Sequence, residues 1–225
     1  MPWKSTLIGG DDLWQKGQYC VHHVIVGCKE TFAIEVESDV SPLTQDPWAL
    51  GSFAYWIGGK RYGSPVGELY RIEFSIVQIL RLLEIEDSSI ADDLFDHDPM
   101  AIVLSFLSYH FGGEIIADED DLMDFMTFMK SWILQLAPNG TPPFDGSDIL
   151  VYFLWKGHRA YFLCGEDVVS QDYVERGIRL DDDGGYRSVK NLIRFDIDKE
   201  TVFQVVRDLQ AHCPRRRSDV VDGSP

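Results

Sequence analysis

The chain has 225 residues, of which 45% are apolar and 12% aromatic, so it can bury a sizeable core without metals or disulfides. Its 37 acidic residues outnumber 20 Lys and Arg, and the formal net charge of -17 argues against nucleic acid and anionic membranes as partners. No secretory signal can be read at the N-terminus, and the longest apolar runs, such as 149–155, fall far short of the roughly 20 residues that span a bilayer. The four cysteines are sparse and irregularly spaced, which suits reduced thiols, so the composition predicts a cytoplasmic protein.

The first third of the chain has the alternating pattern of β-hairpins. Apolar and polar residues alternate over 32–37, and Gly58-Gly59 marks the tight turn of a second hairpin. A helix with a broad apolar face follows, and the capping-box pattern Ser75-Ile76-Val77-Gln78 predicts that it begins at Ser75. The predicted strands in this part are 19–26, 31–37, 52–57 and 60–62.

The rest of the chain combines helices and strands. Two stretches, 99–110 and 121–136, space Met, Phe, Leu and Ile as helices do. Asp198 is predicted to cap a final helix, and the tail 214–225, which has no apolar periodicity, is predicted to be disordered. The further predicted strands are 149–155, 160–164 and, after an irregular stretch, 191–197.

These elements predict an α/β (α+β) protein with a mostly antiparallel sheet built from hairpins, packed helices and a helical acidic insert. Residues 1–213 are predicted to form a single domain, followed by the disordered tail 214–225. The hairpins of the two halves echo each other, and each is followed by a strand and a helix. The corresponding pseudo-repeat comprises 18–84 and 147–213, which flank the helical acidic part 85–137. Because β-hairpins share composition, such an echo is also expected without duplication.

The most specific feature is an acidic segment, residues 82–129, which contains 13 acids and no Lys or Arg. The remaining 24 acids face 20 bases, so this segment carries -13 of the -17. Acids at helix N-termini and on solvated helix faces explain part of it, but solvated faces normally mix both signs. An electrostatic docking surface for a basic protein is therefore the favoured interpretation. The predicted partner-binding residues are Asp92, Asp93, Asp96, Asp98, Asp118, Glu119, Asp120 and Asp121.

Candidate catalytic and metal-binding groups are few. Cys20, His22, His23 and Cys28 are of types that suit zinc, but they have neither CxxC nor HxxxH spacing. Cys164, between Leu and Gly at a predicted strand end, is interpreted as a packed core thiol. Because no set of base, nucleophile and orienting group can be recognised, we predict no catalytic, metal or cofactor site.

Several segments together resemble a known family. They are FAIEVE at 32–37, WALGSFAYWIGGK at 48–60, the helix over 75–84 and the strand 192–197 that runs into a helix from Lys199. In these segments the chain resembles bacterial polymorphic-toxin immunity proteins, in particular the immunity protein 42 family. The acidic helical insert and the basic tail are not part of the recognised pattern.

The resemblance implies a cytosolic antidote that binds the toxin domain of a contact-dependent or secretion-system effector and has no catalytic residues. Many such toxins are basic nucleases, so an acidic surface would steer the encounter and mimic the phosphates that the toxin binds. Two alternatives stay open: a general protein-binding adaptor and a metal-dependent hydrolase that uses clustered acids. Such a hydrolase would gain thermal stability from Mg2+ or Mn2+.

Overall fold

The structure, a computed structural model, divides the chain into two compact units. The first unit holds the described residues up to Glu86 together with those from Glu200 onward, and the second holds those from Phe95 to Lys199. The described residues are 22–39, 50–63, 70–86, 95–111, 113–116, 134–135, 149–180 and 184–213.

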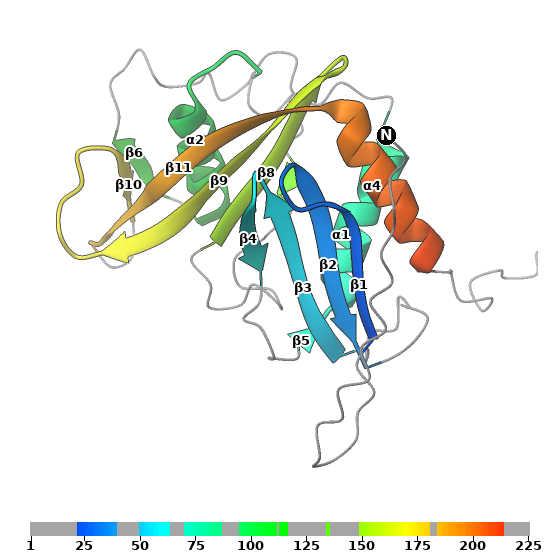
Figure 1. The fold of residues 1–225 in the computed structure, drawn as a ribbon. Helices are drawn as coiled ribbons and strands as arrows, with labels where there is room; N and C mark the ends of the chain where they lie inside the picture. The colour runs from blue at the N-terminus through cyan, green and yellow to red at the C-terminus, as the bar shows by residue number, and fades with distance from the viewer. Residues whose placement is uncertain are drawn as a thin grey trace, which may run out of the picture. The chain divides into compact units, whose positions relative to one another are not determined.

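The first unit contains a five-stranded antiparallel sheet, drawn in blue and cyan in Figure 1. Its strands follow the order β1-β2-β3-β4, and β5 pairs with β3 beside that path. The β3–β4 turn needs Gly58 and Gly59, because both have positive φ angles, 58° and 83°. The strands are β1 (His22–Cys28), β2 (Phe32–Ser38), β3 (Leu50–Ile57), β4 (Lys60–Gly63) and β5 (Tyr70–Arg71).

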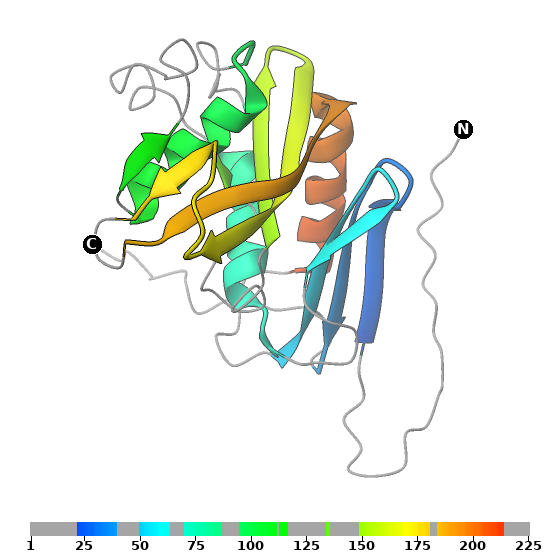
Figure 2. The ribbon, with the colours of Figure 1, turned by 90° about the vertical axis from the view of Figure 1, so that its left-hand side faces the viewer.

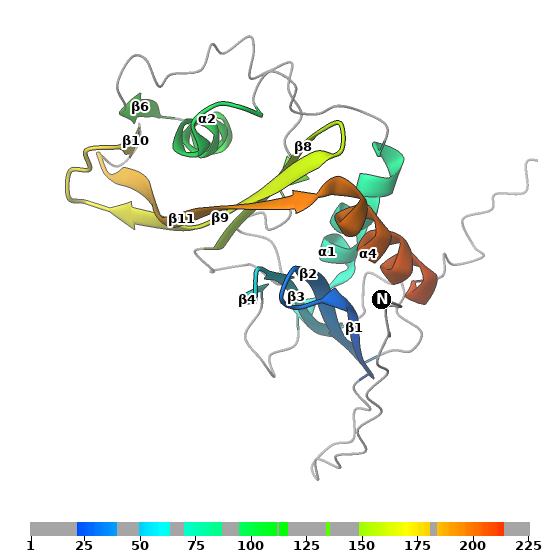
Figure 3. The same cartoon turned by 45° about the horizontal axis from the view of Figure 1, so that its top comes forward.

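Side-chain alternation gives this sheet one apolar face, which two helices cover (Figure 3). The helices are α1 (Glu73–Leu80), which continues into the 3-10 turn η1 (Arg81–Glu84), and α4 (Lys199–His212). Helix α4 approaches β1 so closely that a Cβ at Gly27 would lie 2.9 Å from Cγ2 of Val205. The buried side chains of this core include Phe32, Ile34, Val36, Phe53, Tyr55, Ile57, Ile76, Ile79, Val202, Phe203, Val206 and Leu209.

The second unit contains a six-stranded antiparallel sheet of order β6-β10-β11-β9-β8-β7, with α2 packed on one face (Figures 2 and 3). Its core joins Leu150, Tyr152 and Leu154 of β8 to Ile102 and Leu107 of α2. The elements are α2 (Pro99–Phe111), β6 (Glu114–Ile116), β7 (Leu134–Gln135), β8 (Ile149–Lys156), β9 (Arg159–Ser170), β10 (Gly177–Arg179) and β11 (Tyr186–Asp198).

The longest ladder of the second sheet joins β9 to β11. The pairing register of this ladder changes between Lys190 and Ile193, as at a β-bulge. There Asn191 has a φ of 52°, and its side-chain amide donates a 3.1 Å hydrogen bond to Glu166. Strand β11 passes directly into α4, and the backbone N–H of Lys199 donates a 2.9 Å hydrogen bond to the carbonyl of His158. One continuous piece of chain therefore supplies a strand to the second unit and a helix to the first.

The predicted α+β class with a mostly antiparallel, hairpin-built sheet is confirmed, and so are both N-terminal hairpins and the final helix after Asp198. The predicted helix start at Ser75 is wrong. Helix α1 begins at Glu73, and Ser75 is buried on the core face, so its hydroxyl does not cap the helix. The region after 164, predicted to be irregular, is mostly strand, because β9 runs to Ser170.

The segment 85–137, predicted to be helical, also contributes strands to the second sheet. Helix α2 is present as predicted, and the strand β6 follows it. At the end of the second predicted helix, 121–136, Leu134–Gln135 pair instead with Phe153 and Tyr152 of β8. The rest of that predicted helix and the tail 214–225 lie outside the described residues.

Candidate partner-binding site

Of the eight predicted partner-binding acids, the structure describes Asp96 and Asp98. Both precede α2, and their side chains are 71% and 41% exposed. The remaining six, Asp92, Asp93, Asp118, Glu119, Asp120 and Asp121, lie outside the described residues.

Four described carboxylates of the acidic segment have a basic partner from elsewhere in the chain. Lys156 Nζ lies 3.7 Å from Asp96, and Arg176 pairs with Asp98. The other two pairs are Arg179 with Glu114 and Arg207 with Glu86. The segment is therefore partly neutralised by strands and a helix that follow it, across separations of up to 121 residues. Sequence reasoning missed this compensation, because no local pattern pairs residues so far apart.

Asp98 also has a structural role at the start of α2. Its Oδ2 accepts a 3.0 Å hydrogen bond from the backbone N–H of Ala101, and its carbonyl accepts one from Ile102. Pro99 follows at the first helical position, where a missing N–H is harmless. Asp98 is thus the N-cap of α2, a role the D-P sequence could have indicated.

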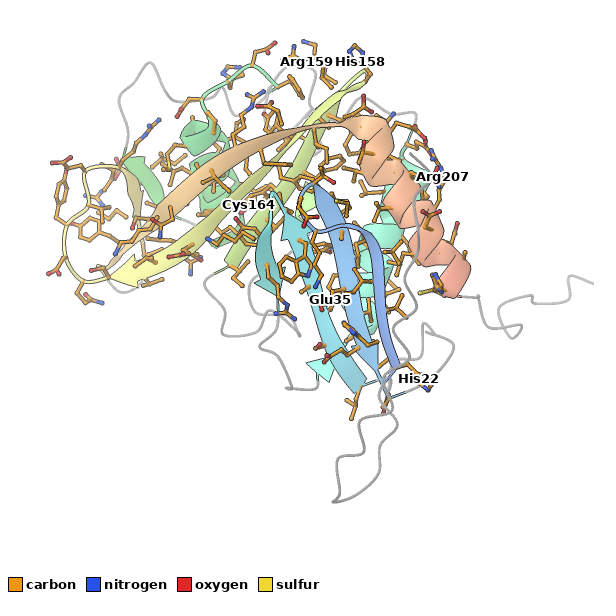
Figure 4. The ribbon with its side chains drawn as sticks, viewed as in Figure 1. His22, Glu35, His158, Arg159, Cys164 and Arg207 are labelled. Atoms are coloured by element: carbon orange, nitrogen blue, oxygen red, sulfur yellow. The ribbon has the colours of Figure 1, made fainter. Side chains whose placement is uncertain are left out.

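Phe95 anchors the acidic segment to the second sheet. Its ring is fully buried and lies 4.8 Å from the ring of Tyr161. Two guanidinium groups cover the same aromatic pair: Arg159 lies 4.9 Å from the Phe95 ring, and Arg194 lies 3.9 Å from the Tyr161 ring. The basic side chains at this end of the sheet, where Figure 4 labels His158 and Arg159, therefore position the residues just before α2.

A second polar cluster occupies the face of the first sheet opposite the apolar core, around Glu35 of β2 (Figure 4). Its Oε2 accepts hydrogen bonds from Trp56 Nε1 at 2.8 Å and from Arg61 Nε at 3.0 Å. Its Oε1 lies 2.9 Å from His23 Nε2 and 3.7 Å from Lys29 Nζ. Lys29 Nζ in turn lies 4.0 Å from the centre of the Trp56 ring. Four strand or turn side chains thus converge on one carboxylate and hold each other in place.

The environment of Glu35 keeps it ionised. Burial of the carboxylate favours its neutral form, but the hydrogen bonds from Trp56, Arg61 and His23 and the charge of Lys29 outweigh that effect and lower its pKa from 4.5 to about 2. The sequence had offered His23 as a zinc-type residue. The structure shows it as a partner of this carboxylate, with His22 on the opposite face of β1.

A buried ion pair lies in the second sheet. Asp167 of β9 is 3% exposed, and its Oδ1 lies 3.4 Å from Nε of Arg187 on β11. Burial, and then the charge of Asp167, raise the pKa of the Tyr152 hydroxyl on β8, so this phenol stays neutral. Because both side chains are largely buried, removal of either charged partner would destabilise the fold.

Two of the three described cysteines, Cys164 and Cys213, are buried. Cys164 is fully buried, as its interpretation as a core thiol requires. Burial also raises the pKa of Cys213 to about 12, so its thiol does not ionise near neutral pH. Cys28, at the end of β1, donates a 3.1 Å hydrogen bond to Glu30. Among the described residues, Cys28, Cys164 and Cys213 are free thiols, and no group of His, Cys, Asp and Glu has the arrangement of a metal site.

Comparison with known proteins shows that this chain is an immunity protein. The sequence model of the family immunity protein 42 matches residues 24–212, and the chain therefore belongs to this family. Among solved structures, the crystal structure of CdiI from Burkholderia dolosa AUO158 is similar, with a TM-score of 0.47 and 14% sequence identity over 84% of this chain and 99% of that chain. No curated protein matches the chain.

The matched range 24–212 includes the acidic segment within its bounds. Within the part of the chain that the structure describes, no helix is long and apolar enough to cross a membrane.

We predict that Glu35 contributes an acid-sensitive share of the stability. Because its pKa in the folded protein, about 2, lies below its ordinary value of 4.5, its stabilisation is complete above pH 4.5 and is lost as the pH falls through 2. Urea unfolding from pH 6 to pH 2 should show that the unchanged protein loses about 3 kcal/mol more than the Glu35→Gln variant. Glu37→Gln, on the same face, should keep the acid-sensitive loss. An equally steep loss in Glu35→Gln would contradict this assignment.

A second prediction separates the two roles of Asp98. Asn caps helices about as well as Asp, and the pair with Arg176 is partly exposed, so Asp98→Asn should cost only a few tenths of a kcal/mol in the free energy of unfolding. Asp98→Ala removes the cap as well and should cost about 1 kcal/mol. Denaturant unfolding of both variants measures the difference. Equal losses would show that the ion pair, and not the cap, is the important contact.

Proposed function

We propose that this protein neutralises a bacterial toxin domain by binding to it stoichiometrically in the cytoplasm, without catalysing a reaction. The observation that carries the proposal is membership of the immunity protein 42 family over residues 24–212. The acidic composition supports the same mode of action, because a net charge of -17 favours rapid encounter with a basic protein.

We further propose that the toxin docks on the acidic segment and that the toxin is basic. The contact residues would be the eight acids predicted from the sequence, Asp92, Asp93, Asp96, Asp98, Asp118, Glu119, Asp120 and Asp121. Asp96 and Asp98 have internal partners but remain 71% and 41% exposed, so basic side chains of the toxin can also reach them. If the toxin is a nuclease, these carboxylates would occupy the place of nucleic acid phosphates.

Capture from native cells tests the function. The tagged protein should retain one basic protein at low salt and release it at raised salt, because surface charge pairs are screened. The gene for this partner should lie directly beside the gene for the protein, and the partner expressed alone should stop growth. Co-expression of the immunity protein should restore growth. If the neighbouring protein neither binds nor is neutralised, the proposed function is wrong.

Charge neutralisation tests the docking surface. Changing Asp92, Asp93, Asp120 and Asp121 to Asn should slow association with the captured toxin about tenfold at low salt and flatten its salt dependence. The control carries the same charge change elsewhere, with Glu30, Asp39, Asp196 and Asp208 changed to their amides. Stopped-flow association rates at several salt concentrations compare the two. Equal slowing in both variants would mean that net charge matters and the location does not.

A further inference from the structure

The loop between β9 and β10, residues 171–176, presents the most exposed large apolar side chain of the described residues. Tyr173 is 67% exposed, compared with 40% for Leu50 and 42% for Ile193. Its ring meets that of Tyr186, the first residue of β11, edge to face, with 5.6 Å between the ring centres. Val169, near the end of β9, is 55% exposed. We refer to Val169, Tyr173 and Tyr186 as the aromatic tip; it belongs to the second unit and lies at the end of the β9–β11 ladder.

Two contacts brace the loop that carries Tyr173. The hydroxyl of Ser170 accepts a 3.0 Å hydrogen bond from the backbone N–H of Asp172, which closes a tight turn. Three residues after Tyr173, Arg176 pairs with Asp98 and so ties the loop to the start of α2. Tyr173 is therefore exposed on a loop that is tied down on both sides of it. An ordered tyrosine is well suited to binding, because it offers a large contact area and loses little side-chain freedom.

The charges around the tip are arranged asymmetrically. Its basic neighbours Arg176, Arg187 and Arg179, the last of which pairs across strands with Tyr186, contact Asp98, Asp167 and Glu114 of the same unit. The acids that flank the tyrosine, Asp172 and Glu175, are exposed, and within the described residues neither has an ion-pair partner. The surface that surrounds Tyr173 thus offers negative charge to solvent, which complements a basic partner.

We propose that the aromatic tip is an anchor for the basic toxin domain, with Tyr173 packed into the toxin surface and Asp172 and Glu175 paired with its Lys or Arg side chains. The proposal rests on the proposed function and extends it to a second contact. The Arg176–Asp98 pair makes the tip continuous with the acidic segment. In this arrangement the acidic segment governs the rate of encounter, and the tip governs how long the complex lasts, because buried aromatic anchors act mainly on dissociation.

The test uses the full-length protein and the toxin domain captured by the unchanged chain. Tyr173→Ala should raise the Kd about 10- to 100-fold, mostly through faster dissociation. Changing Asp172 and Glu175 to their amides should instead slow association at low salt a few-fold. Ile193→Ala is the matched control, since it removes a partly exposed apolar side chain from β11 outside the tip, and its Kd should stay within twofold. Because Tyr173 is exposed, the thermal unfolding midpoint of Tyr173→Ala should match that of the unchanged protein.

Site-specific crosslinking provides an independent readout. With p-benzoylphenylalanine placed at position 173 or at position 193, irradiation should link the toxin to position 173 only. A Kd for Tyr173→Ala within twofold of the unchanged protein, or linkage from position 193 alone, overturns the tip proposal and leaves the immunity function standing. If the unchanged protein binds no toxin, both proposals fail.

Discussion

The antiparallel ladder between β9 and β11 determines where the charges of the second unit stand. The register of the ladder fixes Arg159, Arg187 and Arg194. Arg179 lies on β10, which pairs with β11, and Arg176 lies in the loop just before β10. From these positions they reach the carboxylates of Asp98, Glu114 and Asp167 and the rings of Phe95 and Tyr161. A register shift of one residue would turn each strand side chain to the other face and separate these partners. The placement of the acidic segment on the second sheet therefore depends on the ladder.

Among the described residues, each unit holds a largely buried carboxylate together with basic partners, as burial of charge requires. Glu35 in the first unit is surrounded by His23, Lys29, Trp56 and Arg61, and Asp167 in the second lies against Arg187. The chain has 37 acids and 20 bases, so a base that pairs with a buried carboxylate cannot also neutralise an acid at the surface. The chain keeps a net charge of -17, which would favour encounter with a basic partner of the kind that we propose.

The internal ion pairs of Asp96 and Asp98 affect the proposed contact with the toxin, but they do not change the electrostatic attraction at a distance. Lys156 and Arg176 reduce the local field at Asp96 and Asp98, but the net charge of -17 stays the same, so steering at low salt persists. In the proposed complex, a basic side chain of the toxin would share these carboxylates with their internal partners. Exposed pairs of this kind contribute little to stability, so such sharing costs little. A long-lived complex would then need further contacts, and the aromatic tip is the one that we propose.

The sequence alone determined the α+β class, the N-terminal hairpins, α2, the final helix and the family, because local alternation, glycine turns and short apolar motifs encode these features. It also located the excess of acids. Only the tertiary structure decided which acids have partners, since Glu86 and Arg207 are 121 positions apart and meet through folding. The tertiary structure also decided that Leu134–Gln135 form a short strand, because these residues become a strand by pairing with β8. Buried Ser75 shows the limit of local rules: a capping pattern was present, but core packing placed the serine inside the helix. Local periodicity thus specified the elements, whereas long-range pairing of strands and charges specified which charged side chains have partners within the chain.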